Sequence, residues 1–93
     1  MTTHPDHICG GAMLDAPIPP SLDAPPIISV VITPVANPDA ACRQPQHGPE
    51  PIVGCAQVQG AVCAVVIPRD GSAAFRWRVL KHELAHCNGW KHP

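Results

Sequence analysis

Three histidines near the end of the sequence, His82, His86 and His92, have the spacing of ligands to one metal ion. Residues four apart lie on one face of a helix, so the imidazoles of His82 and His86 can point to the same position. Gly89 is expected to end that helix, because glycine adopts positive φ without steric strain, and the turn brings His92 back as a third ligand. Three protein ligands and one open position are typical of a catalytic zinc site, whereas a structural site has four.

Glu83 directly follows the first histidine and lies about 100° further round the same helix. This direction places its carboxylate beside the metal rather than on it. A carboxylate in that position can take a proton from a metal-activated water and then deliver it to a leaving amine. Glu83 is therefore the candidate catalytic residue, and the three histidines are the candidate ligands of one Zn²⁺ ion.

The run from His82 to His92 reads HELAHCNGWKH and fits the pattern HExxHxxGxxH. It resembles the extended zinc-binding signature of the metzincin metallopeptidases. The resemblance implies zinc ligation by the three histidines, a general-base role for Glu83, and hydrolysis of peptide bonds in a peptide or protein substrate. Metzincins carry a methionine-containing turn after the third histidine, whereas only Pro93 follows His92 here. A partner or second subunit would then be expected to complete the cleft.

A non-catalytic alternative remains open, namely a zinc-stabilised binding module derived from a metallopeptidase. The missing methionine turn favours this alternative, because it leaves the substrate cleft half built. Glu83 favours the enzyme, because a purely structural site has no use for a carboxylate beside the metal.

Composition restricts the other functional classes. The chain has 93 residues, a net charge of −1 and six Lys and Arg residues, which argues against nucleic-acid binding. No stretch approaches the roughly 20 apolar residues that cross a membrane. No signal peptide is recognisable, whereas five cysteines are compatible with an extracytoplasmic site, so the compartment is not predicted.

Proline divides the chain into two parts. Much of the segment 1–26 is proline-rich and is expected to be poorly ordered, so the minimal zinc-binding domain is assigned to 27–93. His4, His7 and Cys9 lie close together in that first segment. Terminal segments are usually mobile, and no fourth ligand follows at a useful spacing, so a second metal site is not predicted there.

The sequence of residues 27–93 predicts a small α+β domain with a three-stranded sheet and one C-terminal active-site helix. Three runs rich in β-branched or apolar residues, 27–33, 52–58 and 61–67, are the expected strands. Gln59 and Gly60 are expected to form the hairpin turn between the last two runs. Residues 40–43 are compatible with one helical turn.

The expected active-site helix begins near Ala73, with Ser72 as its N-cap. At 100° per residue, Phe75 and Val79 share a stripe with His82 and His86. A second apolar stripe contains Trp77, Leu80, Leu84 and Cys87.

Four cysteines, Cys42, Cys55, Cys63 and Cys87, lie in the predicted domain. With a turn at 59–60, Ala56 is opposite Cys63, so Cys55 and Cys63 point to opposite faces of the sheet. A disulfide from Cys87 to whichever of these two faces the helix, with Cys42 joined to the other, would link the helix to the sheet. Free buried thiols are the alternative. A structural zinc site is a third option, with the ligands Cys42, His47, Cys55 and Cys63.

Overall fold

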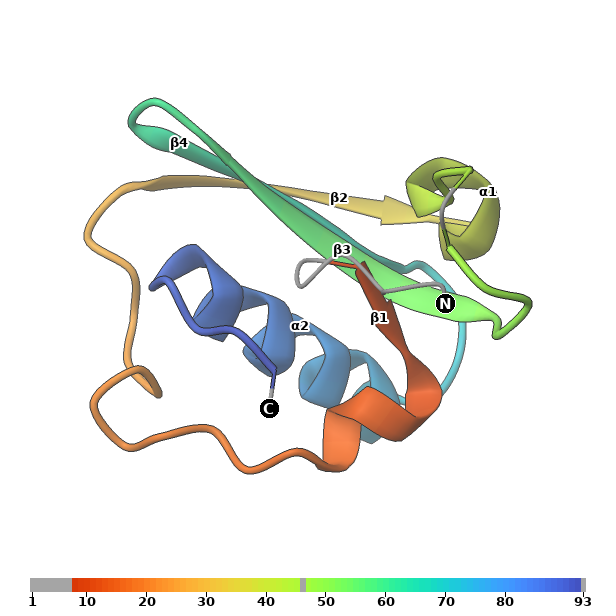
Figure 1. Ribbon diagram of the computed structural model, residues 1–93, viewed down its shortest axis with the longest axis horizontal. Coiled ribbons are helices and arrows are strands. Elements are labelled where there is room, and N and C mark those ends of the chain that lie inside the picture. The colour runs from red at the N-terminus through yellow and green to blue at the C-terminus, as the bar shows by residue number, and fades with distance from the viewer. Residues whose placement is uncertain (1–7, 46, 93) are drawn as a thin grey trace.

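The computed structural model describes residues 8–45 and 47–92. Seven elements follow one another: β1 (Ile8–Gly10), a 3-10 helix η1 (Gly11–Asp15), β2 (Ser29–Val35), α1 (Pro38–Cys42), β3 (Ile52–Gln59), β4 (Val62–Pro68) and α2 (Ala73–Cys87). The strands form one sheet in the order β1-β3-β4-β2 (Figure 1). β2 is parallel to β4, and the other neighbours are antiparallel. The fold is therefore a small α+β domain with a C-terminal helix.

The sheet has four strands, so the prediction of a three-stranded sheet is wrong. The additional strand is β1, which pairs with β3 and places Ile8 opposite Cys55 and Cys9 opposite Gly54. It comes from the segment 1–26, whose composition indicated little regular structure. Ile8 and Cys9 precede the proline-rich stretch 17–26, and both are fully buried, so the open edge of β3 gives this short apolar stretch a partner. Residues 1–7, which include His4 and His7, lie outside the described residues.

The hairpin between β3 and β4 turns at 60–61, one residue later than predicted, and Gly60 adopts a φ of 61°. Val58 rather than Ala56 is consequently opposite Cys63. This difference is a shift of two residues, and a shift of two keeps every side chain on its predicted face. Cys63 accordingly faces α2, and Cys55 faces the other side of the sheet, where α1 lies.

One face of the sheet packs against α2, and the main core lies between them. Ala56, Val65 and Ile67 from the strands pack there with Val79 from the helix. The predicted N-cap is confirmed, because the Ser72 hydroxyl accepts a hydrogen bond from the backbone N–H of Phe75 at 3.1 Å. Trp77 departs from its predicted apolar stripe: its exposed fraction is 59 %, and it lies beside the proline-rich segment instead of in the core.

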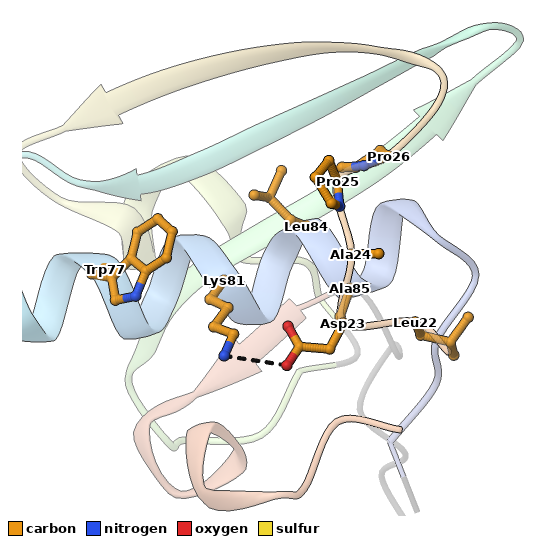
Figure 2. Close-up of a pocket in the computed structure, with 9 residues that line it drawn as sticks. All are labelled: Leu22, Asp23, Ala24, Pro25, Pro26, Trp77, Lys81, Leu84 and Ala85. Carbon is orange, nitrogen blue, oxygen red and sulfur yellow. Dashed lines mark ion pairs between the residues drawn. The ribbon is translucent and has the colours of Figure 1, made fainter. Parts of the chain in front are cut away.

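That proline-rich segment runs along the outer side of α2 (Figure 2). The Asn88 side-chain amide donates hydrogen bonds to the backbone carbonyls of Leu22 and Ala24, at 2.9 and 2.7 Å. Lys81 forms an ion pair with Asp23 at 3.2 Å. Together these contacts hold the segment at the C-terminal half of the helix and leave a shallow apolar groove beside Trp77.

Two disulfides join the elements. Cys63–Cys87 links β4 to the last residue of α2, and Cys42–Cys55 links α1 to β3. This is the pairing in which the helix is linked to the sheet, and it excludes both the free-thiol alternative for these four residues and the structural zinc site with His47. Two disulfides are compatible with an extracellular location. None of the described helices combines the length and apolar character that crossing a membrane requires.

Asp39 connects α1 to the loop before β3 and gives a pH-dependent contribution to stability. Its carboxylate accepts hydrogen bonds from the Arg43 guanidinium and from the backbone N–H of Ile52, and these lower the pKa of Asp39 to about 2. A lowered native pKa stabilises the fold above the unfolded value near 3.8, and this stabilisation is lost as the pH falls towards 2.

We therefore expect Asp39→Asn to lower the urea midpoint at pH 6, with the difference from wild type shrinking as the pH falls from about 4 to 2. Urea unfolding at a series of pH values measures this. Asp70→Asn is the control, because the Asp70 side chain is 75 % exposed and its ion pair with Arg69 spans 3.7 Å. A difference between Asp39→Asn and wild type that is the same at pH 6 and pH 2 would contradict this assignment.

Candidate metal centre

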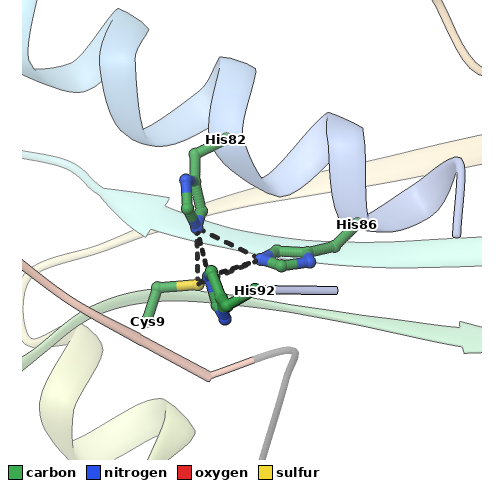
Figure 3. A group of neighbouring side chains, drawn as sticks. All are labelled: Cys9, His82, His86 and His92. Atoms are coloured by element: carbon green, nitrogen blue, oxygen red, sulfur yellow. Dashed lines mark hydrogen bonds between the residues drawn. The ribbon is translucent and has the colours of Figure 1, made fainter. Parts of the chain in front are cut away.

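Four side chains converge at one end of α2: Cys9, His82, His86 and His92 (Figure 3). One ligand atom from each, the Cys9 Sγ and a ring nitrogen of each histidine, lies within 4.8 Å of all the others. The three histidines that the motif singled out are therefore brought together. The fourth member, Cys9, was not predicted. This group can bind a metal ion.

The distances within the group describe a compact tetrahedron. The Nε2 atom of His82 lies 2.7 Å from that of His92 and 3.1 Å from that of His86, and the His86 and His92 Nε2 atoms are also 3.1 Å apart. The Cys9 Sγ lies 3.1 to 3.5 Å from each of the three nitrogens. The three Nε2 atoms and the Cys9 Sγ all lie around one centre, so these four atoms share one coordination volume.

The helix and its C-terminal turn explain how the histidines meet. His82 and His86 lie one helical turn apart on α2 and face the sheet. Gly89 has a φ of 94°, and the backbone N–H of Trp90 donates to the carbonyl of Ala85 at 3.1 Å, which is the hydrogen bond of a Schellman turn. The predicted termination at Gly89 is confirmed, and it reverses the chain so that His92 reaches the other two histidines.

Trp90 lies inside this turn and supports two of the rings. Its indole stacks on His86 with a centroid distance of 5.1 Å and meets His82 edge-on at 5.0 Å. Its backbone carbonyl lies 2.8 Å from the His86 Nδ1. A proton on Nδ1 satisfies that contact and leaves the His86 Nε2 lone pair free for a metal, which is the usual arrangement around a ligating histidine.

Cys9 reaches the site because β1 pairs with β3. Cys9 is opposite Gly54, so both lie on the face of the sheet that meets α2. Gly54 makes the approach of the helix possible: a Cβ there would lie 2.8 Å from the Val79 Cγ1 and 3.0 Å from the Glu83 Oε2. The absence of that side chain allows the helix, the strand and Cys9 to share this small space.

Glu83 is fully buried next to this group. The Cys9 thiol donates a long hydrogen bond to its Oε1 at 3.6 Å. Among the described residues its Oε2 has no hydrogen-bond partner, and neither has the Nδ1 of His82. A buried carboxyl oxygen without a partner is energetically unfavourable and rarely persists without a function or a bound group to explain it.

Burial sets the protonation states of the metal-free site. It lowers the pKa of His82 to about 3, with the neighbouring His86 and His92 as further causes. Burial also raises the pKa of Glu83 to about 8, and it raises the pKa of the Cys9 thiol well above its ordinary value. His82 is therefore neutral at pH 7, which is the form that binds a metal. Cys9 must lose its proton to become a thiolate ligand, and Glu83, which is mostly protonated at pH 7 in the metal-free site, must lose its proton to act as a base; a bound cation favours both losses.

The sequence contained one indication of Cys9. Five is an odd number of cysteines, and two disulfides leave Cys9 as the free one. A leftover cysteine in a chain with three clustered histidines is a candidate ligand. Its position in a proline-rich terminal segment hid this connection, because only the pairing of β1 with β3 brings it to the helix.

Comparison with known proteins finds no matching family model, no matching curated protein and no matching solved structure. The resemblance to metzincins therefore rests on the motif alone. What the structure establishes is the coarser statement that a Cys/His₃ group in this fold can hold a metal ion. The identity of the metal and the catalytic role of Glu83 belong to the proposal that follows.

Proposed function

We propose that the chain is a zinc-dependent peptidase, and that the described conformation is its closed form, with Cys9 in the fourth ligand position. The donor set supports zinc, since histidine nitrogens and a cysteine sulfur in a tetrahedral arrangement are typical zinc ligands. The edges of such a site are about 3.3 Å between nitrogens and about 3.6 Å from sulfur to nitrogen, from the usual zinc bond lengths. The observed 2.7 to 3.5 Å approach these values.

The observation that carries the catalytic part is the position of Glu83. Its Oε1 lies 3.6 Å from the Cys9 Sγ, which marks the fourth ligand position, and no described residue forms a hydrogen bond with its Oε2. If Cys9 withdraws, a water molecule that takes the place of the sulfur has this carboxylate as its nearest proton acceptor. A bound zinc ion would supply the acidification of water and the polarisation of a peptide carbonyl. Glu83 would then accept the proton of that water and return it to the leaving amine.

The sheet supports an extended peptide as the substrate. β1 lies antiparallel along β3 and occupies the edge nearest to the metal-binding group. β1 contains only three residues, so its pairing with β3 is short. A peptide that replaced β1 would form main-chain hydrogen bonds with the same edge of β3, which is a common mode of peptide recognition.

A second candidate is the zinc-stabilised module without catalytic activity. Cys9 is the specific observation in its favour, because a fourth protein ligand closes the site as in structural zinc centres. The two candidates differ in what removal of the Cys9 sulfur does: it opens a reactive position in the peptidase and only weakens metal binding in the module.

The test measures zinc content and hydrolysis of casein or a quenched peptide for wild type, Cys9→Ala and the double variant Cys9→Ala with Glu83→Gln. For a peptidase we expect one zinc per chain in all three, the fastest hydrolysis in Cys9→Ala, and a loss of at least 100-fold in the double variant. Cobalt substitution adds a second readout, since a thiolate-to-cobalt absorption band in wild type and not in Cys9→Ala reports ligation by Cys9.

Zinc in all three proteins with no hydrolysis in Cys9→Ala would favour the binding module. Wild-type protein without zinc would contradict both candidates. A double variant as active as Cys9→Ala would contradict the role of Glu83 while leaving the zinc site intact.

A further inference from the structure

We propose that two copies of this chain associate through their β2 strands, forming one continuous eight-stranded sheet. This inference is independent of the metal centre and of the proposed peptidase activity. β2 is the last strand in the order β1-β3-β4-β2, and in the described part of the chain no strand pairs with its outer edge (Figure 1). A seven-residue edge strand offers backbone groups to any second strand that can align with it.

The hydrogen bonds of β2 identify the groups on that edge. The Ser29 N–H donates to the Ala61 carbonyl at 3.1 Å, and the Val35 carbonyl accepts from the Arg69 N–H at 2.8 Å. Odd-numbered residues of β2 therefore point their backbone groups towards β4. Because this direction alternates along a strand, the backbone groups of Val30, Ile32 and Pro34 point to the outer edge.

These outward groups are self-complementary in one register. In an antiparallel pair centred on Val31, Val30 of each copy is opposite Ile32 of the other. Such a pair exchanges two hydrogen bonds, and the two-fold axis repeats it, which gives four hydrogen bonds and uses all the outward N–H groups of Val30 and Ile32. Pro34, which has no N–H, is then at the end of the interface. A register shifted by two residues towards the C-terminal end would place Pro34 opposite Val30 and lose a donor, and a shift of four would place Pro34 opposite Ile32 with the same loss.

The side chains of β2 fit the same arrangement. Val31 is 54 % exposed and Ile32 is 43 % exposed, although β-branched residues gain most in a strand when neighbours cover them. Pairing centred on Val31 places the two Val31 side chains together on one face, and packs Ile32 against Val30 of the partner copy on the other.

The charges of the chain give no obstacle to this contact. Residues 24–38 contain no charged side chain, whereas natural edge strands usually carry lysine or another charge that prevents pairing. With a net charge of −1, two copies repel each other only weakly. A second copy is thus the partner that matches this edge in hydrogen-bond register and in its uncharged surface.

Sedimentation equilibrium of the full chain between about 1 and 200 µM tests the proposal. We expect a wild-type dimer, and a dissociation constant raised at least tenfold by Val31→Lys, which places two like charges at the axis. Ile32→Pro is expected to act similarly, because it removes an outward N–H that β4 does not use. Val58→Lys is the matched control: Val58 is 50 % exposed and lies on β3, which β4 separates from β2, so this variant should dimerise like wild type.

Amide hydrogen exchange distinguishes this interface from any other. The N–H groups of Val30 and Ile32 should be protected in the dimer and become exchangeable on dilution or in Val31→Lys. A wild type that stays monomeric throughout the concentration range would overturn the proposal. So would a dimer that survives both Val31→Lys and Ile32→Pro, or one in which these two amides exchange freely.

Discussion

Removing the metal from zinc-loaded protein with a chelator is expected to lower its melting temperature by about 10 to 30 °C. Free zinc at 100 to 1,000 times its dissociation constant stabilises the folded state by about 3 to 4 kcal/mol, and a domain of this size shifts by roughly 4 to 8 °C per kcal/mol. The stabilisation concerns both ends of the chain, because Cys9 comes from β1 and the three histidines come from α2 and the turn after it.

Loss of zinc also leaves an unfavourable arrangement behind. The three Nε2 atoms stay within 3.1 Å of one another, and the buried Nδ1 of His82 has no partner in the part of the chain that the structure describes. Differential scanning calorimetry with and without chelator measures the effect. His82→Ala should melt at the same temperature in both conditions, whereas His47→Gln, which changes a buried histidine outside the group, should keep the full response. A wild type that is indifferent to the chelator would show that the group does not hold a stabilising metal.

Local spacing explains why part of the site could be predicted. The positions of His82 and His86 follow from the periodicity of one helix, and the return of His92 follows from the backbone freedom of Gly89. Each of these features depends on residues within one or two turns. The strands near 27–33, 52–58 and 61–67 were also identified within about two residues, because β-branched runs between turn residues are local signals.

Local sequence patterns predict neither β1 as a strand nor Cys9 as a member of the metal-binding group. The pairing of Ile8 with Cys55 joins segments that are distant in sequence, and no local pattern in a proline-rich terminus specifies it. The hairpin register was predicted wrongly because Gly60 fits the first position of a two-residue turn as well as the second, and both registers place the same side chains on the same faces of the sheet. Trp77 was assigned to an apolar stripe of the helix, but its side chain is 59 % exposed and lines a groove with the proline-rich segment.

Opening the Cys63–Cys87 disulfide is the second change with a large expected effect. The double variant Cys63→Ala with Cys87→Ala removes a crosslink of 24 residues, and the loss of loop-closure entropy predicts a decrease of about 3 to 4 kcal/mol in the free energy of unfolding. The Cys42–Cys55 crosslink encloses 13 residues, so its removal by a matched double variant should lower stability by about 3 kcal/mol. Urea unfolding of both variants without zinc compares the two losses.

The two variants should differ in metal binding, because the disulfides hold different parts of the site. Cys87 follows His86 directly and fixes the end of α2 to β4, so without this bond the last turn can open and separate His86 and His92 from His82. If the open turn leaves the three histidines assembled in only about a tenth of the molecules, the dissociation constant for zinc rises about tenfold. The Cys42–Cys55 disulfide lies on the opposite face of the sheet, beside Ile8 of β1. Its removal should therefore leave the three histidines in place. Zinc titration with a competing chelator measures this difference, and equal affinities in the two variants would mean that the helix end is held by the turn at Gly89 and the packing of Trp90 rather than by the disulfide.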